Sequence, residues 1–188
     1  MFSAYNYPSS CSSVEFYRGP VLRSLSDNFS EYFEDALIVT QKNGQKAGLI
    51  VAIGEATKVA KELKLDLSKL KKNMDLLMPA FFDTHFHWVQ DDVRQMPKVS
   101  LIEWLERYTF PEEAKYSDQK FSSVKAKRFW KRILSVGTIG GLCYSSVHEV
   151  ALEEAFKHAP EDFYIGNVLM TMNCPEDIRQ SPHNALSL

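Results

Sequence analysis

Apolar runs separated by turn residues dominate the first third of the chain. Gly19-Pro20 and Lys42-Asn43-Gly44 are strong turn signals, and each divides one run from the next. Residues 55–72 instead carry apolar positions near helical spacing among many lysines, which predicts a solvated helix and a connector. The runs themselves predict three strands of a small β-unit, at Val14–Leu22, Ala36–Thr40 and Leu49–Ile53.

From residue 76 onward the pattern alternates between strand and helix. Leu76–Phe82 is a continuous apolar run, which predicts a strand buried on both faces of a parallel sheet. Ser100 and Glu103 form a capping box, and residues 118–136 predict an amphipathic helix that ends at Gly137. Because strands and helices alternate, we expect βαβ units and an α/β fold. The remaining predicted elements are strands at Thr138–Tyr144 and 163–172 and a helix at Glu149–His158.

Composition and charge narrow the classes of function. The 188 residues are 45% hydrophobic with a net charge of −2, so no basic surplus points to nucleic acid or to an anionic membrane. No apolar run approaches the roughly 20 residues of a membrane span, and the first residues lack the pattern of a secretory signal. The scattered cysteines Cys11, Cys143 and Cys174 favour free thiols, so we expect a cytoplasmic protein.

These patterns divide the chain into three parts. We expect a flexible N-terminus at 1–13, a small β-unit with its connector at 14–73, and βα units at 74–188. Ser181-Pro182 is a helix-start signal, yet few residues follow it. The sequence therefore predicts that the chain ends in the middle of a fold.

The candidate chemistry lies in the stretch PAFFDTHFHWVQDD, residues 79–92. On a strand, His85 and His87 share a face at roughly 6.6 Å between Cα atoms, so both imidazoles can reach one metal ion. Asp83 shares that face and can act as an orienting group. A pair of partly buried histidines held by backbone carbonyls is the more common explanation of a bare His-x-His, so spacing alone does not establish a metal site.

The context of this pair resembles a known family. PAFFDTHFH is similar to the Pro-Gly-apolar-apolar-Asp-x-His-x-His signature of the amidohydrolase superfamily, with Ala80 in place of the glycine. HFHWVQDD and the following LIEWLERYTFPEEAKY resemble the guanine deaminase branch of that superfamily. The likeness extends from about Val14 over nearly the whole remaining chain.

The resemblance implies a fold, a metal and a set of site residues. The fold would be the first part of a metal-dependent (β/α)8 barrel preceded by a small β-sandwich unit, with the barrel incomplete in this chain. His85 and His87 match two zinc ligands, Gln90 matches a residue that hydrogen-bonds the purine, and Asp83 would support the ligands. One wall of the substrate pocket would consist of His87, Trp88, Val89 and Gln90.

The implied reaction is hydrolysis of guanine to xanthine and ammonia, in which zinc-activated water attacks C2. The general base, a glutamate, and the further metal ligands match nothing in this chain, so we expect the 188 residues alone to be inactive. The resemblance also implies a homodimer for the complete protein. Met170-Thr171-Met172-Asn173 departs from the family, which often has an aspartate where Thr171 stands.

Three alternatives compete with this interpretation. A zinc deaminase of the cytidine type requires His-x-Glu and a later Pro-Cys-x-x-Cys, and both motifs are absent. Another amidohydrolase, such as a chlorohydrolase, would keep both histidines and differ in the pocket. A non-catalytic protein could instead use an open sheet edge to associate with itself or another chain. Among other residues, Trp104 could pack on a planar base and His148 could face the same site, whereas His158 and His183 lie on polar stretches.

Overall fold

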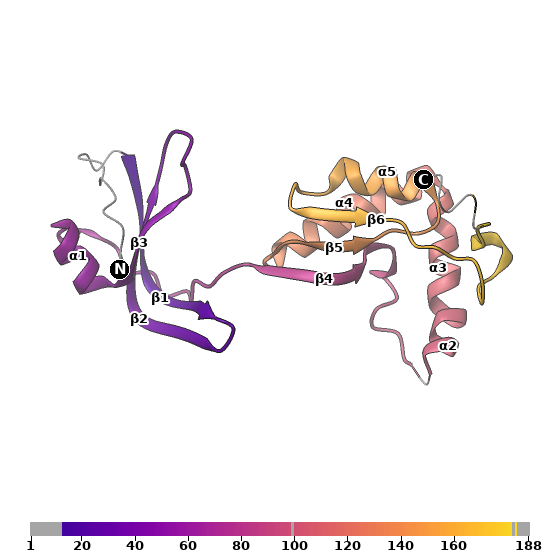
Figure 1. The fold of residues 1–188 in the computed structure, drawn as a ribbon, viewed down its shortest axis with the longest axis horizontal. Helices are drawn as coiled ribbons and strands as arrows, with labels where there is room; N and C mark the ends of the chain where they lie inside the picture. The colour runs from indigo at the N-terminus through magenta and orange to yellow at the C-terminus, as the bar shows by residue number, and fades with distance from the viewer. Residues whose placement is uncertain (1–12, 99, 182, 184–188) are drawn as a thin grey trace. The chain divides into compact units, whose positions relative to one another are not determined.

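The computed structural model describes residues 13–98, 100–181 and 183. Contacts between residues divide the chain into two compact units, with the division between Pro79 and Ala80. Each unit has its own sheet and its own core (Figure 1). No helix within the described residues is long and apolar enough to cross a membrane.

The first unit is a three-stranded antiparallel sheet. Its strand order is β1-β2-β3, and the helix α1 follows β3 and packs on the sheet. Leu37 and Val39 of β2 meet Ala56, Val59 and Ala60 of α1 in a buried cluster. The bounds are β1 Val14–Ser26, β2 Phe29–Gln41, β3 Ile50–Glu55 and α1 Ala56–Leu63, with a 3-10 turn at Leu67–Lys69.

One prediction for this unit is wrong in detail. Gly19-Pro20 does not divide two strands, because it lies inside β1 at a shift in the register with β2. The backbone absorbs the proline as a bulge, which is where a strand tolerates a missing N–H donor. The helix and connector predicted over 55–72 are confirmed, because Lys64 adopts a left-handed conformation with φ of 55°, which ends α1 and begins the connector. The turn at 42–44 is confirmed.

The second unit confirms the predicted alternation of strand and helix. Its sheet is parallel, in the order β4-β5-β6, with long crossovers that contain the helices (Figure 1). Asp118 caps α4 by accepting a hydrogen bond from the backbone of Phe121, and the helix stops before Gly137, whose φ is 83°. The strands are β4 Phe81–His87, β5 Thr138–Tyr144 and β6 Phe163–Gly166. The helices are α2 Leu101–Trp104, α3 Phe110–Ala114, α4 Gln119–Ser135 and α5 Glu149–His158. A short π-helix lies at Leu105–Thr109, and 3-10 turns lie at Trp88–Gln90, Lys115–Ser117 and Glu176–Ile178.

Helices α4 and α5 cover one face of this sheet. Phe129 and Trp130 of α4 and Ala151 and Ala155 of α5 pack against Cys143 and Phe163 of the strands. The rings of Phe86 and Phe129 stack with centroids 5.8 Å apart, and Trp130 lies 4.9 Å from Phe163. This cluster is the main core of the unit.

The predicted strand Leu76–Phe82 is wrong in position and in burial. The strand begins at Phe81 and continues through the two histidines, so they lie within it. Phe81 and Phe82 are 51% and 63% exposed, so the start of the strand is buried on neither face. Strand β6 is likewise shorter than predicted, since 167–172 are irregular. The predicted flexible end at 1–13, apart from Ser13, and most of the predicted helix start after Ser181 lie outside the described residues.

Candidate active site

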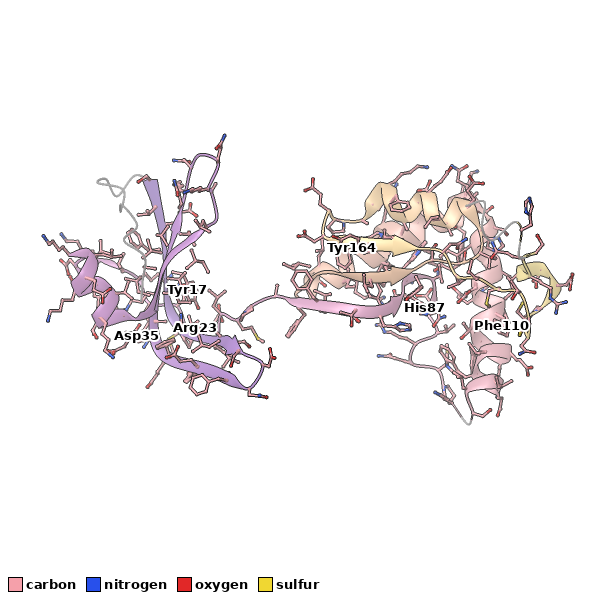
Figure 2. All side chains as sticks on the ribbon, in the orientation of Figure 1. Tyr17, Arg23, Asp35, His87, Phe110 and Tyr164 are labelled. Carbon is pink, nitrogen blue, oxygen red and sulfur yellow. The ribbon has the colours of Figure 1, made fainter. Side chains whose placement is uncertain are left out.

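Strand β4 places both histidines on the face of the sheet that the helices leave open. The rings of His85 and His87 lie 5.5 Å apart between centroids, as the period of two in a strand requires. Tyr144, at the end of the neighbouring β5, lies 5.0 Å from His85 and 5.1 Å from His87. Figure 2 shows His87 at the carboxyl end of β4. The three rings thus gather at the end of two parallel strands, where α/β proteins commonly bind ligands.

The approach of β4 to β5 depends on a glycine. A Cβ on Gly141 would lie 1.9 Å from the carbonyl oxygen of Asp83, so no other residue fits there without moving a strand. Asp83 itself accepts a hydrogen bond of 3.1 Å from the backbone N–H of His85. The carboxylate therefore supports the backbone of a candidate ligand; a contact with its imidazole stays a prediction.

His87 has the environment of a neutral imidazole. Burial, and secondarily the charge of His85, lower its pKa below the ordinary value. Its Nδ1 is buried and has no hydrogen-bond partner among the described residues. A neutral imidazole with an unpaired nitrogen suits a metal ligand. The described residues contain no cluster of three or more His, Cys, Asp or Glu side chains that could hold a metal ion.

The 3-10 turn after β4 carries the rest of the predicted pocket wall. Trp88 and Val89 are fully buried; the indole N–H of Trp88 donates to Ser145 Oγ at 3.1 Å, and its ring meets Tyr116 edge-on. Neither side chain lines the cavities described below. Substrate contact by these two residues stays a prediction, and it would have to involve their backbone groups.

Gln90 ends this turn and lines a cavity of about 260 Å³. Its side-chain Nε2 donates to Glu113 Oε1 at 2.8 Å. Phe110, at the start of α3 (Figure 2), lines the same cavity. The cavity combines polar and apolar groups: His87, Gln90, Leu105, Thr109, Phe110, Glu113, Val168, Met170, Met172 and Asn173.

Sequence reasoning missed Glu113 and Thr109. Glu113 is buried at 3% exposure, and this burial raises the pKa of its carboxyl, although the hydrogen bond from Gln90 opposes the shift. Thr109 is 1% exposed, and its hydroxyl has no partner among the described residues. Their partners in the cavity are far away in sequence, so no local spacing pattern identifies them.

A larger cavity of about 470 Å³ also borders the histidine pair. Asp83, His85, His87 and Gln90 contribute to its lining, together with the arginines Arg94 and Arg132. Both arginines pair with Asp91, and the Arg132 Nη1–Asp91 Oδ1 distance is 2.8 Å. The pair with Arg132 ties the segment after Gln90 to α4, so the turn has a fixed anchor.

The remaining candidate residues lie away from the histidine pair. Trp104 is half-buried at the end of α2 and lines neither cavity. His148 follows β5; burial lowers its pKa, and its Nε2 has no partner among the described residues. His158 lies on α5 with Nε2 3.6 Å from Glu154.

Residues 170–173, which depart from the family pattern, follow β6. Met170, Met172 and Asn173 line the smaller cavity, whereas Thr171 does not.

Comparison with known proteins gives this geometry a context. No protein-family model matches the chain. It is 35% identical over 104 residues to guanine deaminase of Escherichia coli, covering 54% of this chain and 24% of that protein. It is 31% identical over 153 residues to a probable guanine deaminase of Deinococcus radiodurans, covering 78% of this chain and 34% of that protein.

Solved structures show the same fold. Guanine deaminase from C. acetobutylicum, with guanine bound, aligns with a TM-score of 0.72 and 21% identity over 93% of this chain and 41% of that one. A mutant of atrazine chlorohydrolase from Arthrobacter aurescens, complexed with zinc and atraton, aligns with a TM-score of 0.58 and 17% identity, covering 92% and 41%.

The chain thus spans well under half the length of these proteins. Its small antiparallel sheet followed by parallel β/α units confirms the predicted α/β fold and matches the N-terminal part of guanine deaminase structures. The predicted family is confirmed as well: the chain is a homologue of the guanine deaminases, within the amidohydrolase superfamily, and corresponds to an N-terminal portion of them.

Proposed function

We propose that this chain provides part of a guanine deaminase site, namely two zinc ligands and one wall of the guanine pocket. The observation that carries the proposal is the position of His85 and His87. They lie on one face of β4, and His87 also lines the cavity that contains Gln90. A metal ion held by the two imidazoles would therefore lie beside a ligand bound against Gln90.

The two histidines fit zinc by their chemistry. Imidazole nitrogens are common zinc ligands, and the unpaired, buried Nδ1 of His87 shows an imidazole whose hydrogen bonding is incomplete within the described residues. When bound in such a site, zinc lowers the pKa of water so that it can attack a carbon at neutral pH. The proposal needs at least one further protein ligand and a general acid/base, because zinc sites use three or four protein ligands.

The smaller cavity fits the proposed substrate class. Phe110 and Met170 offer apolar surface for a planar base, while Gln90 offers an amide at the same wall. Related proteins support both parts: one solved guanine deaminase contains guanine, and the chlorohydrolase contains zinc. We carry both ligands over to this chain as part of the proposal.

Zinc binding provides the first test. We expect zinc to raise the thermal stability of the purified chain and expect His85→Ala or His87→Ala to abolish the effect, because each removes one of two ligands. A zinc concentration ten times the Kd would stabilise the wild type by about 1.4 kcal/mol. His158→Ala, a change of the same type on α5, is the control. An equal zinc effect in all four proteins would reject the metal site.

Guanine binding provides the second test. We expect equilibrium dialysis to show binding of guanine that Gln90→Ala weakens, and weaker binding of a triazine such as atrazine. The reverse preference would favour another amidohydrolase. Xanthine formation measured in the same samples reports whether the 188 residues turn over guanine.

A further inference from the structure

Two consecutive glutamates on α3 have opposite surroundings. Glu112 and Glu113 are both buried, at 6% and 3% exposure. Glu112 forms ion pairs with Lys115 at 2.6 Å and with Lys125 at 3.4 Å. Glu113 forms no ion pair with any described residue, and its carboxylate accepts a hydrogen bond from Gln90. A buried carboxylate without a basic partner costs stability, so its position calls for a role in the site.

The hydrogen bond to Glu113 decides which way the amide of Gln90 faces. An ionised carboxylate can only accept hydrogen bonds, whereas an amide offers NH₂ on one side and a carbonyl oxygen on the other. Glu113 therefore selects the Nε2 side of the amide, and Nε2 lies 2.8 Å from Glu113 Oε1. The neighbours of Gln90 hold its backbone still, because Val89 is fully buried and Asp91 is ion-paired to Arg132.

We infer that Glu113 is a positioning residue that turns Gln90 so that its Oε1 faces the cavity and accepts a hydrogen bond from an N–H donor of the bound base. This inference rests on the proposed function, since it assumes that a base occupies the cavity. Gln90 and Glu113 together would thus discriminate between ligands. A ligand with an N–H donor at this edge forms a hydrogen bond to Gln90 Oε1, whereas one with an acceptor or a methyl group there is repelled by that oxygen. Without the hydrogen bond to Glu113, the Gln90 amide could rotate by 180° and bind a ligand with either a donor or an acceptor at this edge.

The orientation can be tested without any ligand. In ¹⁵N-labelled chain, the Gln90 side-chain amide, assigned by its loss in Gln90→Ala, should show one proton shifted and protected from exchange. Glu113→Ala should remove this signature, and Glu113→Gln should weaken it because an amide at 113 can donate as well as accept. Glu112→Gln, the same change one residue earlier, should retain it. An unprotected Gln90 amide in the wild type would overturn the inference.

The selectivity is tested with guanine and three analogues that each lack one donor: hypoxanthine, 1-methylguanine and 9-methylguanine. In the wild type and in Glu112→Gln, at least one analogue should bind about tenfold more weakly than guanine. In Glu113→Gln that penalty should fall to about twofold or less. An unchanged penalty in Glu113→Gln would also overturn the inference.

An exchange of the two side chains tests for rescue. In the double variant Gln90→Glu/Glu113→Gln, the new amide at 113 donates to the carboxylate at 90, which still presents an acceptor oxygen to the cavity. The analogue penalty should return, which a general loss of packing at position 113 would not allow. If the wild-type amide is protected but guanine does not bind, the proposed function fails and the positioning of Gln90 stands.

Discussion

The two faces of the parallel sheet differ although they share the same three strands. On one face Phe86, Cys143 and Phe163 pack against α4 and α5 and form the main core. On the other face Leu142 and Tyr164 are 44% and 76% exposed, and the rings of the histidine pair lie beside Tyr144. The first face is therefore packed against the helices, while the second carries the candidate metal ligands.

This difference follows from the alternation of side chains along a strand. Neighbouring residues such as Phe86 and His87 point to opposite faces, so the packed residues fix the positions of the chemical ones. The packed core fixes the positions of the site residues, and it contains none of the site's polar groups. Changes on the two faces should accordingly have separate consequences, and three predictions test this separation.

The largest effect should come from the strand contact that both faces share. Gly141→Ala would place a Cβ 1.9 Å from the Asp83 carbonyl, at a φ of 154° that other residues rarely adopt, so β4 and β5 cannot keep their register. We expect a loss of more than about 4 kcal/mol in unfolding free energy, or failure to fold. Chemical denaturation followed by circular dichroism measures it.

Gly166→Ala is the matched control for this change. A Cβ there meets no atom within 4 Å, so we expect a change within about 1 kcal/mol. Equal losses in the two variants would mean that the close approach of β4 to β5 is not what holds the sheet.

The next effect separates the faces directly, at two adjacent residues of β6. Phe163 is 7% exposed and packs against Trp130, whereas Tyr164 is 76% exposed on the other face (Figure 2). We expect Phe163→Ala to cost about 3–5 kcal/mol and Tyr164→Ala within about 0.5 kcal/mol. Urea denaturation of both variants measures the difference. A comparable loss at Tyr164 would show that its face is packed in solution, as a self-associating protein requires.

The sequence predicted what depends on local pattern. The alternation of strands and helices, the cap at Ser100 and the stop at Gly137 follow from spacing and turn chemistry, and the structure has them. His85 and His87 could be identified as candidates because their spacing of two residues fixes a shared face. Their role as zinc ligands remains a proposal.

Features that depend on distant partners were not predictable. Burial of Leu76–Phe82 was inferred from apolarity alone, but whether a face is covered depends on elements elsewhere in the chain. The hydrogen bond between Gln90 and Glu113 joins residues 23 positions apart, and it exists only because α3 packs beside the turn after β4. A tryptophan such as Trp88 is more often a core residue than part of a base pocket, and the fold shows its side chain in the core.

The smallest effect concerns the dependence of stability on pH. Burial raises the pKa of Glu113 above its ordinary value of 4.5, so the folded protein binds this proton more tightly than the unfolded chain does. Stability from the protonated form is therefore full below pH 4.5 and is lost as pH rises from there through the raised pKa. Glu113→Gln is neutral throughout, so its stability relative to the wild type should increase with pH over this interval and then level off.

The difference in stability between Glu113→Gln and the wild type reports on the Glu113 carboxyl. His87, whose pKa is lowered by burial, is present in both proteins, so its contribution cancels. Denaturation midpoints measured between pH 4 and pH 8 give the profile. Glu112→Gln loses the ion pairs to Lys115 and Lys125, so it should be less stable than the wild type at neutral pH. If the stability of Glu113→Gln followed the same dependence on pH as that of the wild type, the Glu113 carboxyl would be as well solvated in the folded protein as in the unfolded chain. The open side of the sheet would then lack the buried carboxylate that distinguishes its pocket from an ordinary surface.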